Sequence, residues 1–273
     1  ALVRVCVTAQ HREMLDQVLE VFDVHPDWDL DLMRPGQSLF ESTSRMIAGL
    51  EHVFRQERPD LALVQGDTTT TLCGALAAFY SGVPVGHVEA GLRTGDPSQP
   101  FPEEMNRMLT SRLATLHFAA TPRAARNLIR EGVRKDRIWI TGNTVIDAVL
   151  HVSRRLEQGE LLGLGDRLPA DERKLVVVTA HRRESFGEPL RRICQALAQL
   201  ARRADVQIVY PVHPNPSVSG PVRELLGGID NVALWPPLDY VEFVDLMRRA
   251  YLLITDSGGI QEEGPSLGKP ILV

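Results

Sequence analysis

The sequence of 273 residues has few cysteines. Its three cysteines, Cys6, Cys73 and Cys194, lie far apart, and each is flanked by apolar residues. Disulfide-stabilised secreted folds and cysteine-based zinc sites need more cysteines at closer spacings. We therefore expect three buried, reduced thiols, as is typical of cytoplasmic proteins.

The sequence also lacks long apolar runs and an excess of basic residues. No run approaches the roughly 20 apolar residues that span a bilayer. With 30 Lys and Arg against 35 Asp and Glu, the net charge is −5, which argues against general binding to a nucleic-acid backbone. We expect neither a membrane nor a nucleic acid as partner.

Motifs for common metal and cofactor sites are missing as well. The sequence contains no HExxH, CxxC, GxGxxG or GxxxxGK[ST], and its His, Asp and Glu residues show no compact metal-ligand spacing. We expect no metal and no cofactor.

What the chain does contain is an alternation of short β-branched runs with longer segments of helical period. This alternation is typical of parallel sheets covered by helices. The predicted strands are 3–7, 61–64, 83–88, 138–140, 175–179, 206–210, 232–235 and 252–255, and the predicted helices are 12–22, 68–80, 189–202 and 240–249.

A Gly-rich, charged stretch divides this series. We predict an N-terminal Rossmann-like domain over 1–150, an interdomain crossing over 151–173 and a C-terminal Rossmann-like domain over 174–273. The fold class is α/β, with two doubly wound domains facing a cleft. Because the sequence begins and ends in strand-like runs, we expect the first strand of one domain and the last part of the other to lie outside it.

Polar motifs follow the carboxyl ends of the predicted strands. They include QGDT after 61–64, HVEAG after 83–88, TAHRRE after 175–179 and TDSGG after 252–255. Ligands bind at that edge of open α/β sheets, so we expect these motifs to line the site.

The TDSGG motif ends a strand and opens a helix. Ser257, Gly258 and Gly259 would expose backbone N–H groups at a helix N-terminus, which favours an anion such as a diphosphate. Glu263, one turn later, is the candidate for ribose hydroxyls. The alternative is a Gly-rich turn whose aspartate or serine caps the helix.

Three carboxylates of the first domain are candidate acids or bases. Asp67 lies at a strand-to-helix junction, where it could instead cap the helix. Glu89 ends an apolar strand, and Gly91 would allow close approach. Glu103 lies four residues before Arg107, which either tunes it or forms a surface ion pair with it.

Two histidines occur in loops after predicted strands of the second domain. His181 follows four apolar residues, and it either caps a helix or contributes to catalysis or phosphate contact. His213 is held between prolines; the residues alone assign it no role.

Nine strings cover the chain almost from end to end: AQHREMLDQVL, QGDTTTT, GHVEAGLRTGD, FPEEMNR, TGNTVIDA, TAHRRES, VHPNP, PLDYVEFVDLM and TDSGGIQEEGPSLGKP. In this order they resemble the non-hydrolysing bacterial UDP-N-acetylglucosamine 2-epimerases. The resemblance implies a GT-B-like fold with UDP bound mainly by the second domain. It also implies a homodimer that interconverts UDP-GlcNAc and UDP-ManNAc without metal or nicotinamide, through a 2-acetamidoglucal, to supply ManNAc for cell-surface polysaccharides.

The resemblance also implies roles for individual residues. It assigns acid, base and stabilising roles to Asp67, Glu89 and Glu103, an orienting role to Arg107 and a phosphate-side role to His181. Uracil contacts fall on Leu238 and Phe243, and phosphate and ribose contacts on Ser257, Gly258, Gly259 and Glu263. Activation by UDP-GlcNAc in a second pocket would involve Gln10, His11 and His213.

Three alternatives stay open. A hydrolysing 2-epimerase would release free ManNAc and UDP. A GT-B glycosyltransferase would need an acceptor, although the three carboxylates favour proton transfer. A nucleotide-sugar sensor without activity would be free to lose Asp67, Glu89, Glu103, Arg107 and His181, which are all present.

Overall fold

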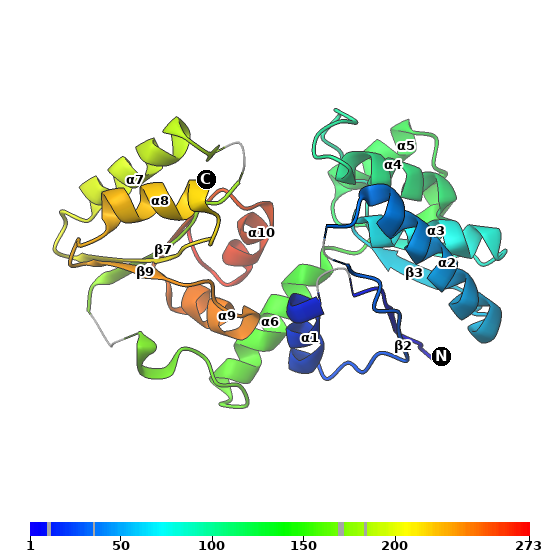
Figure 1. Ribbon diagram of the computed structural model, residues 1–273, viewed down its shortest axis with the longest axis horizontal. Coiled ribbons are helices and arrows are strands. Elements are labelled where there is room, and N and C mark those ends of the chain that lie inside the picture. The colour runs from blue at the N-terminus through cyan, green and yellow to red at the C-terminus, as the bar shows by residue number, and fades with distance from the viewer. Residues whose placement is uncertain (10–11, 35, 169–171, 183–184) are drawn as a thin grey trace. The chain divides into compact units, whose positions relative to one another are not determined.

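Two compact units make up the chain in a computed structural model. The structure describes residues 1–9, 12–34, 36–168, 172–182 and 185–273. One unit is Ala1–Thr144 and the other is Val145–Val273, and Figure 1 shows that each contains its own sheet with helices packed on it. The domain limits at 150 and 173 stay predictions.

The first unit holds a two-stranded and a four-stranded sheet, both parallel. Its strands are β1 (Cys6–Val7), β2 (Trp28–Asp29), β3 (Ala62–Gln65), β4 (Val85–Ala90), β5 (Leu116–Ala119) and β6 (Ile138–Ile140). Its helices are α1 (Arg12–Val21), α2 (Leu39–Glu57), α3 (Thr69–Tyr80), α4 (Glu103–Leu113) and α5 (Pro122–Arg130). The larger sheet has the order β3-β4-β5-β6.

The second unit holds a five-stranded parallel sheet of order β11-β10-β7-β8-β9. Its strands are β7 (Lys174–Thr179), β8 (Val206–Pro211), β9 (Val232–Trp235), β10 (Leu252–Thr255) and β11 (Ile271–Leu272). Its helices are α7 (Glu188–Leu200), α8 (Pro216–Leu226), α9 (Tyr240–Arg249) and α10 (Gly258–Ser266), preceded by α6 (Thr144–Glu157) at the junction of the units.

Helices cover both faces of the second sheet. Alternate residues of β7 and β8, such as Val176 and Ile208, pack against Leu190 and Val222 of α7 and α8. Figure 1 shows α7 and α8 on one side of this sheet and α9 on the other. Because both faces are buried, the central strands are mostly apolar, as parallel strands usually are.

Small side chains bring α3 close to the first sheet. Ala75 and Ala78 are fully or almost fully buried against Val85 of β4, and a Cβ on Gly74 would lie 3.0 Å from Val64 Cγ1. This close packing fixes the N-terminus of α3 beside the end of β3, where the QGDT motif lies.

The structure confirms the α/β class with parallel sheets and most predicted elements. The strand expected over 3–7 is only Cys6–Val7. The sequence patterns missed the short strand β2 and β5, whose apolar run contains a histidine. They also missed the helices α2, α4, α5, α6 and α8. Cys73 and Cys194 are buried as expected, but Cys6 is only half buried. Among the described residues, no helix combines the length and the hydropathy needed to cross a membrane.

We expect Gly91→Ala to destabilise the first unit more than Gly95→Ala does. Both glycines have φ +88, so both variants carry the left-handed strain of about 1–2 kcal/mol. A Cβ on Gly91 would lie 2.4 Å from the Ala124 backbone oxygen, whereas a Cβ on Gly95 would meet no atom of the described residues within 4 Å. The clash should add about 1–3 kcal/mol, measured by urea unfolding. Equal losses in the two variants would contradict this packing.

Candidate functional site

Glu89 occupies a strained position near the end of β4. Its φ is +64, in the left-handed region that residues other than glycine rarely adopt. The pairing with β5 shifts by one residue between Val88 and Ala90, so Glu89 is the extra residue of a β-bulge, a feature that redirects a side chain. A Cβ added to Gly66 would lie 3.7 Å from Glu89 Oε2, which places the carboxylate beside the turn after β3.

That turn, 65–67, is held at each of its three backbone carbonyls by a buried side chain. Thr71 Oγ1 donates to Gln65 O at 2.5 Å. His87 Nε2 lies 2.8 Å from Gly66 O, and because a carbonyl only accepts, this nitrogen carries the proton. Asn106 Nδ2 donates to Asp67 O at 2.9 Å. These bonds fix the turn to α3, β4 and α4.

The Asp67 side chain is paired with Arg107 of α4. Arg107 Nη2 lies 2.9 Å from Asp67 Oδ2, and the arginine side chain is only 12% exposed while the aspartate is 36% exposed. Behind the arginine, Glu104 Oε2 lies 3.4 Å from Arg107 Nε, and Glu104 is 1% exposed. Asp67, Arg107 and Glu104 thus form a row running from the surface into the core.

The pKa of Asp67 is raised above its ordinary value. Burial is the largest cause; the Arg107 charge opposes it, and the carboxylates of Glu103 and Glu104 add to it. A raised pKa makes a carboxyl group better suited to give and take protons near neutral pH.

Two sequence expectations about these residues were wrong. Asp67 does not cap α3, because Thr68 is the N-cap and its hydroxyl accepts from Thr71 N. Among the described residues, the ion pairs of Arg107 are with Asp67 and Glu104 rather than Glu103. Glu104, three residues before Arg107 in this helix, faces the arginine. The negative charge of Glu103, four residues before Arg107, instead raises the pKa of Asp67.

In the second unit, Asp256 organises the loop after β7. Its carboxylate accepts from His181 N and Arg182 N, each at 2.9 Å. Tyr210 Oη donates to Ala180 O at 2.7 Å. From the sequence, Asp256 was considered only as a residue that caps a helix. No local pattern indicates that its carboxylate binds a backbone N–H 75 residues earlier in the chain.

The structure brings His181 and His213 together. Their rings are stacked, with centroids 5.7 Å apart and planes 9° apart. Asn215 N donates to His213 Nδ1 at 3.1 Å, which leaves the proton of the neutral ring on Nε2. His181 lies before the N-cap Gly187 of α7, so it does not cap that helix.

The N-terminus of α10 has the features expected of an anion site. Ser257 is the N-cap residue, but its side chain makes no capping hydrogen bond. Gly258 and Gly259 are exposed, and a Cβ on Gly258 would lie 3.3 Å from Arg182 Nη2. Arg182, which sequence reasoning did not select, therefore brings a cation to the positive end of a helix dipole.

Glu263 lies one turn into α10 and is half buried. Burial raises its pKa, and the Glu262 charge adds to this. Burial also raises the pKa of Tyr240 to about 12, with a contribution from Glu263, which places the start of α9 near this carboxylate. Leu238 and Phe243, on either side of Tyr240, are half buried. Gln10 and His11 lie outside the described residues.

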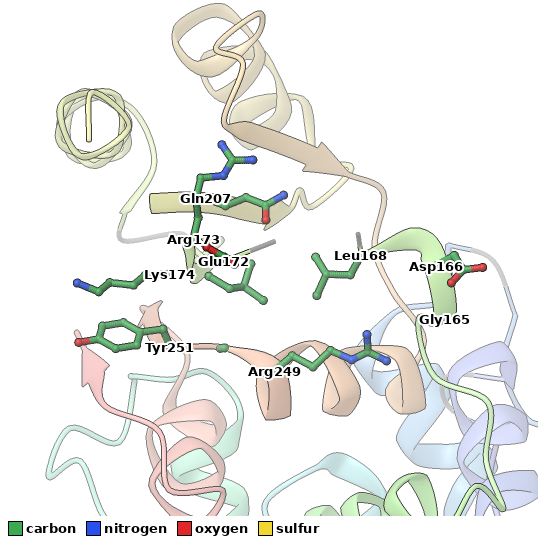
Figure 2. Close-up of a pocket in the computed structure, with 11 residues that line it drawn as sticks. Gly165, Asp166, Leu168, Glu172, Arg173, Lys174, Gln207, Arg249 and Tyr251 are labelled. Atoms are coloured by element: carbon green, nitrogen blue, oxygen red, sulfur yellow. The ribbon is translucent and has the colours of Figure 1, made fainter. Parts of the chain in front are cut away.

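Figure 2 shows a separate pocket of about 590 Å³ at the opposite edge of the second sheet. Lys174, Gln207 and Tyr251, at or beside the amino ends of β7, β8 and β10, line it together with Arg249. Two of its cations already have partners, since Lys174 lies 3.2 Å from Asp205 Oδ2 and Arg249 pairs with Asp245. This pocket does not contain the motif residues. In the part of the chain that the structure describes, no three His, Cys, Asp or Glu side chains gather as for a metal.

Each of the two units has a parallel sheet with polar loops after its strands, and one of these loops opens a helix with glycines. These features are typical of the class of nucleotide-binding α/β proteins. The family model "UDP-N-acetylglucosamine 2-epimerase" matches residues 2–273. A protein of that name from Yersinia pestis is 58% identical over 99% of this chain and 73% of its own length. The Escherichia coli K12 protein of that name is 55% identical with the same coverage.

Solved structures agree with this match. The UDP-GlcNAc 2-epimerase from Neisseria meningitidis, bound to UDP-GlcNAc, has a TM-score of 0.90 and 46% identity, covering 99% of this chain and 74% of its own. MnaA of S. aureus, in a structure with UDP, has a TM-score of 0.83 and 46% identity, covering 98% and 70%. The chain belongs to the UDP-N-acetylglucosamine 2-epimerase family, a family of isomerases.

We expect the first unit to lose stability as the pH falls from about 6.5 toward 4. His87 and His117 face each other across β4 and β5, and burial lowers the pKa of each from 6.5 to about 4. Between these values the unfolded chain binds more protons, so stability is complete above 6.5 and is lost as the pH falls through about 4, by on the order of 3 kcal/mol for each ring. Histidine NMR titration with urea unfolding at pH 7 and 4.5 measures this. An imidazole of either residue titrating near 6.5 would contradict it.

Proposed function

We propose that this chain catalyses the reversible C2 epimerisation of UDP-GlcNAc to UDP-ManNAc, by elimination of UDP and its re-addition to a 2-acetamidoglucal. The observation that carries the proposal is the paired, partly buried Asp67 with its raised pKa, next to a bulge that aims Glu89 at the same turn. Membership in the epimerase family supports it.

The second unit holds the UDP in this proposal. A diphosphate at the N-terminus of α10 accepts hydrogen bonds from the N–H groups of Gly258 and Gly259 and offsets the Arg182 charge beside them. His181, fixed through its backbone by Asp256, contacts the phosphates. Glu263 accepts from the ribose hydroxyls, and Leu238 and Phe243 pack on the uracil.

The first unit supplies the proton chemistry. The C2 hydrogen of the sugar is not adjacent to a carbonyl, so its direct removal is very costly. When the anomeric C–O bond to UDP breaks first, the developing oxocarbenium ion makes this hydrogen acidic. A carboxylate then takes the proton and leaves the glucal double bond. Protonation of C2 on the opposite face and return of UDP to the anomeric carbon complete the reaction.

Asp67, Glu89 and Glu103 are the groups that carry these protons and stabilise the positive charge. Arg107 orients Asp67 through their ion pair. We assign the product to the supply of ManNAc for cell-surface polysaccharides and the working unit to a homodimer. UDP-GlcNAc activation through Gln10, His11 and His213 belongs to the same proposal, and His213 stacks on His181.

The full-length protein in deuterium oxide should convert UDP-GlcNAc to UDP-ManNAc carrying deuterium at C2, observed by proton and phosphorus NMR. Glu89→Gln should lower kcat by about 10²–10⁴-fold, because it removes an acid/base group, with little change in KM. Glu51→Gln, at an exposed position of α2, should behave as wild type. Free ManNAc with UDP would instead establish the hydrolysing reaction, and tight binding without turnover would establish a sensor.

Gly259→Ala should weaken UDP binding by at least about tenfold, measured by calorimetry. The new methyl group would lie 3.9 Å from Glu263 Oε1, an ordinary contact, so the fold should tolerate it while the approach of a phosphate to the N–H groups is obstructed. The matched control is Gly220→Ala, also in a helix, where the new methyl group would meet no described residue within 4 Å. An unchanged affinity of the Gly259→Ala variant for UDP would show that UDP does not bind at the N-terminus of this helix.

A further inference from the structure

Glu104 is a carboxylate buried in the first turn of α4. It is 1% exposed, and its two oxygens have different partners. Oε1 accepts from Thr94 N at 3.0 Å and Gly95 N at 3.2 Å. Oε2 faces Arg107 Nε at 3.4 Å.

The contact with Arg107 is an ion pair without a hydrogen bond. Neither Glu104 Oε2 nor Arg107 Nε has a hydrogen-bond partner among the described residues. Burying two charges with unsatisfied atoms is costly, and an apolar pair of similar volume is often at least as stable. The hydrogen bonds to residues 94 and 95 use only Oε1, so they do not explain why Oε2 lies beside the arginine.

The arginine connects this buried charge to the surface of the site. Its Nη2 binds Asp67 at 2.9 Å, and Asp67 is the most exposed of the three side chains. Arg107 carries five donors on a long side chain, whose orientation must be fixed by its surroundings to hold one carboxylate. Glu104 is the charge on the far side that fixes it.

We propose that Glu104 is a positioning residue of the reaction: its buried carboxylate holds the Arg107 guanidinium so that it faces Asp67. The proposal rests on the proposed function for its kinetic consequences, but the position of Arg107 can be tested without activity. Glu104 touches no substrate in this account; it acts mainly through Arg107, and its charge makes only the smallest of the contributions to the pKa of Asp67.

The kinetic test is a double-mutant cycle on the full-length protein. Glu104→Gln keeps an oxygen for Thr94 N and Gly95 N but removes the charge. It should lower kcat by about 10–100-fold with KM for UDP-GlcNAc within about twofold. In the Arg107→Gln background the same change should cost less than about twofold, because the group through which Glu104 acts is gone. Glu57→Gln, a part-buried carboxylate that accepts from Trp28 Nε1, is the control for loss of a buried charge.

Additive losses in the cycle would overturn the proposal, since anchoring of residues 94–95 alone would act independently of Arg107. So would a kcat of Glu104→Gln equal to that of wild type.

The second readout is ¹⁵N NMR of the arginine side chains. In wild type the Nη signals of Arg107 should be restricted and protected from solvent exchange, and in Glu104→Gln they should exchange rapidly while thermal unfolding stays cooperative. Unchanged Arg107 signals in the variant would overturn the proposal. If wild type does not convert UDP-GlcNAc, the proposed function fails, yet this NMR comparison still decides whether Glu104 positions Arg107.

Discussion

The ion pair between Asp67 and Arg107 is the contact on which the organisation of the first unit's site depends. It joins the end of β3 to α4 and keeps a partly desolvated carboxylate in place. Burial pushes the pKa of Asp67 upward and the arginine pulls it downward, so the protonation of this group reflects a balance between desolvation and charge. Both effects act on the same carboxyl group, so a change at Arg107 would alter the protonation of Asp67.

The backbone around this pair is unusually constrained. Successive carbonyls of the turn accept from Thr71, His87 and Asn106, and Glu89 keeps a left-handed backbone on the neighbouring strand. Strain of this kind costs of order 1–3 kcal/mol and persists only where the surrounding structure over-determines it. The close packing of α3 and α5 on the sheet provides that support. Side chains carried by helices and strands, rather than by long loops, thus keep the turn 65–67 and Glu89 in a fixed geometry.

In the second unit, a parallel sheet of the same kind positions a loop rather than an ion pair. Asp256 holds the loop that carries His181 and Arg182 through two backbone N–H groups. As a result Arg182 lies at the N-terminus of α10, where the helix dipole already favours an anion. The arginine and the helix N-terminus thus place two positive contributions side by side.

The sequence by itself determined the α/β class, most of the strands and the edge at which the polar motifs gather, because periodicity and strand-helix alternation are local properties. It also selected Asp67, Glu89 and the glycines of α10 as candidate site residues from their places after strand ends. Which carboxylate faces Arg107, how Glu89 is turned by a bulge, and that His181 stacks on His213 were decided only by the tertiary structure. These depend on side-chain direction and on contacts between residues far apart in the chain, which no local pattern records.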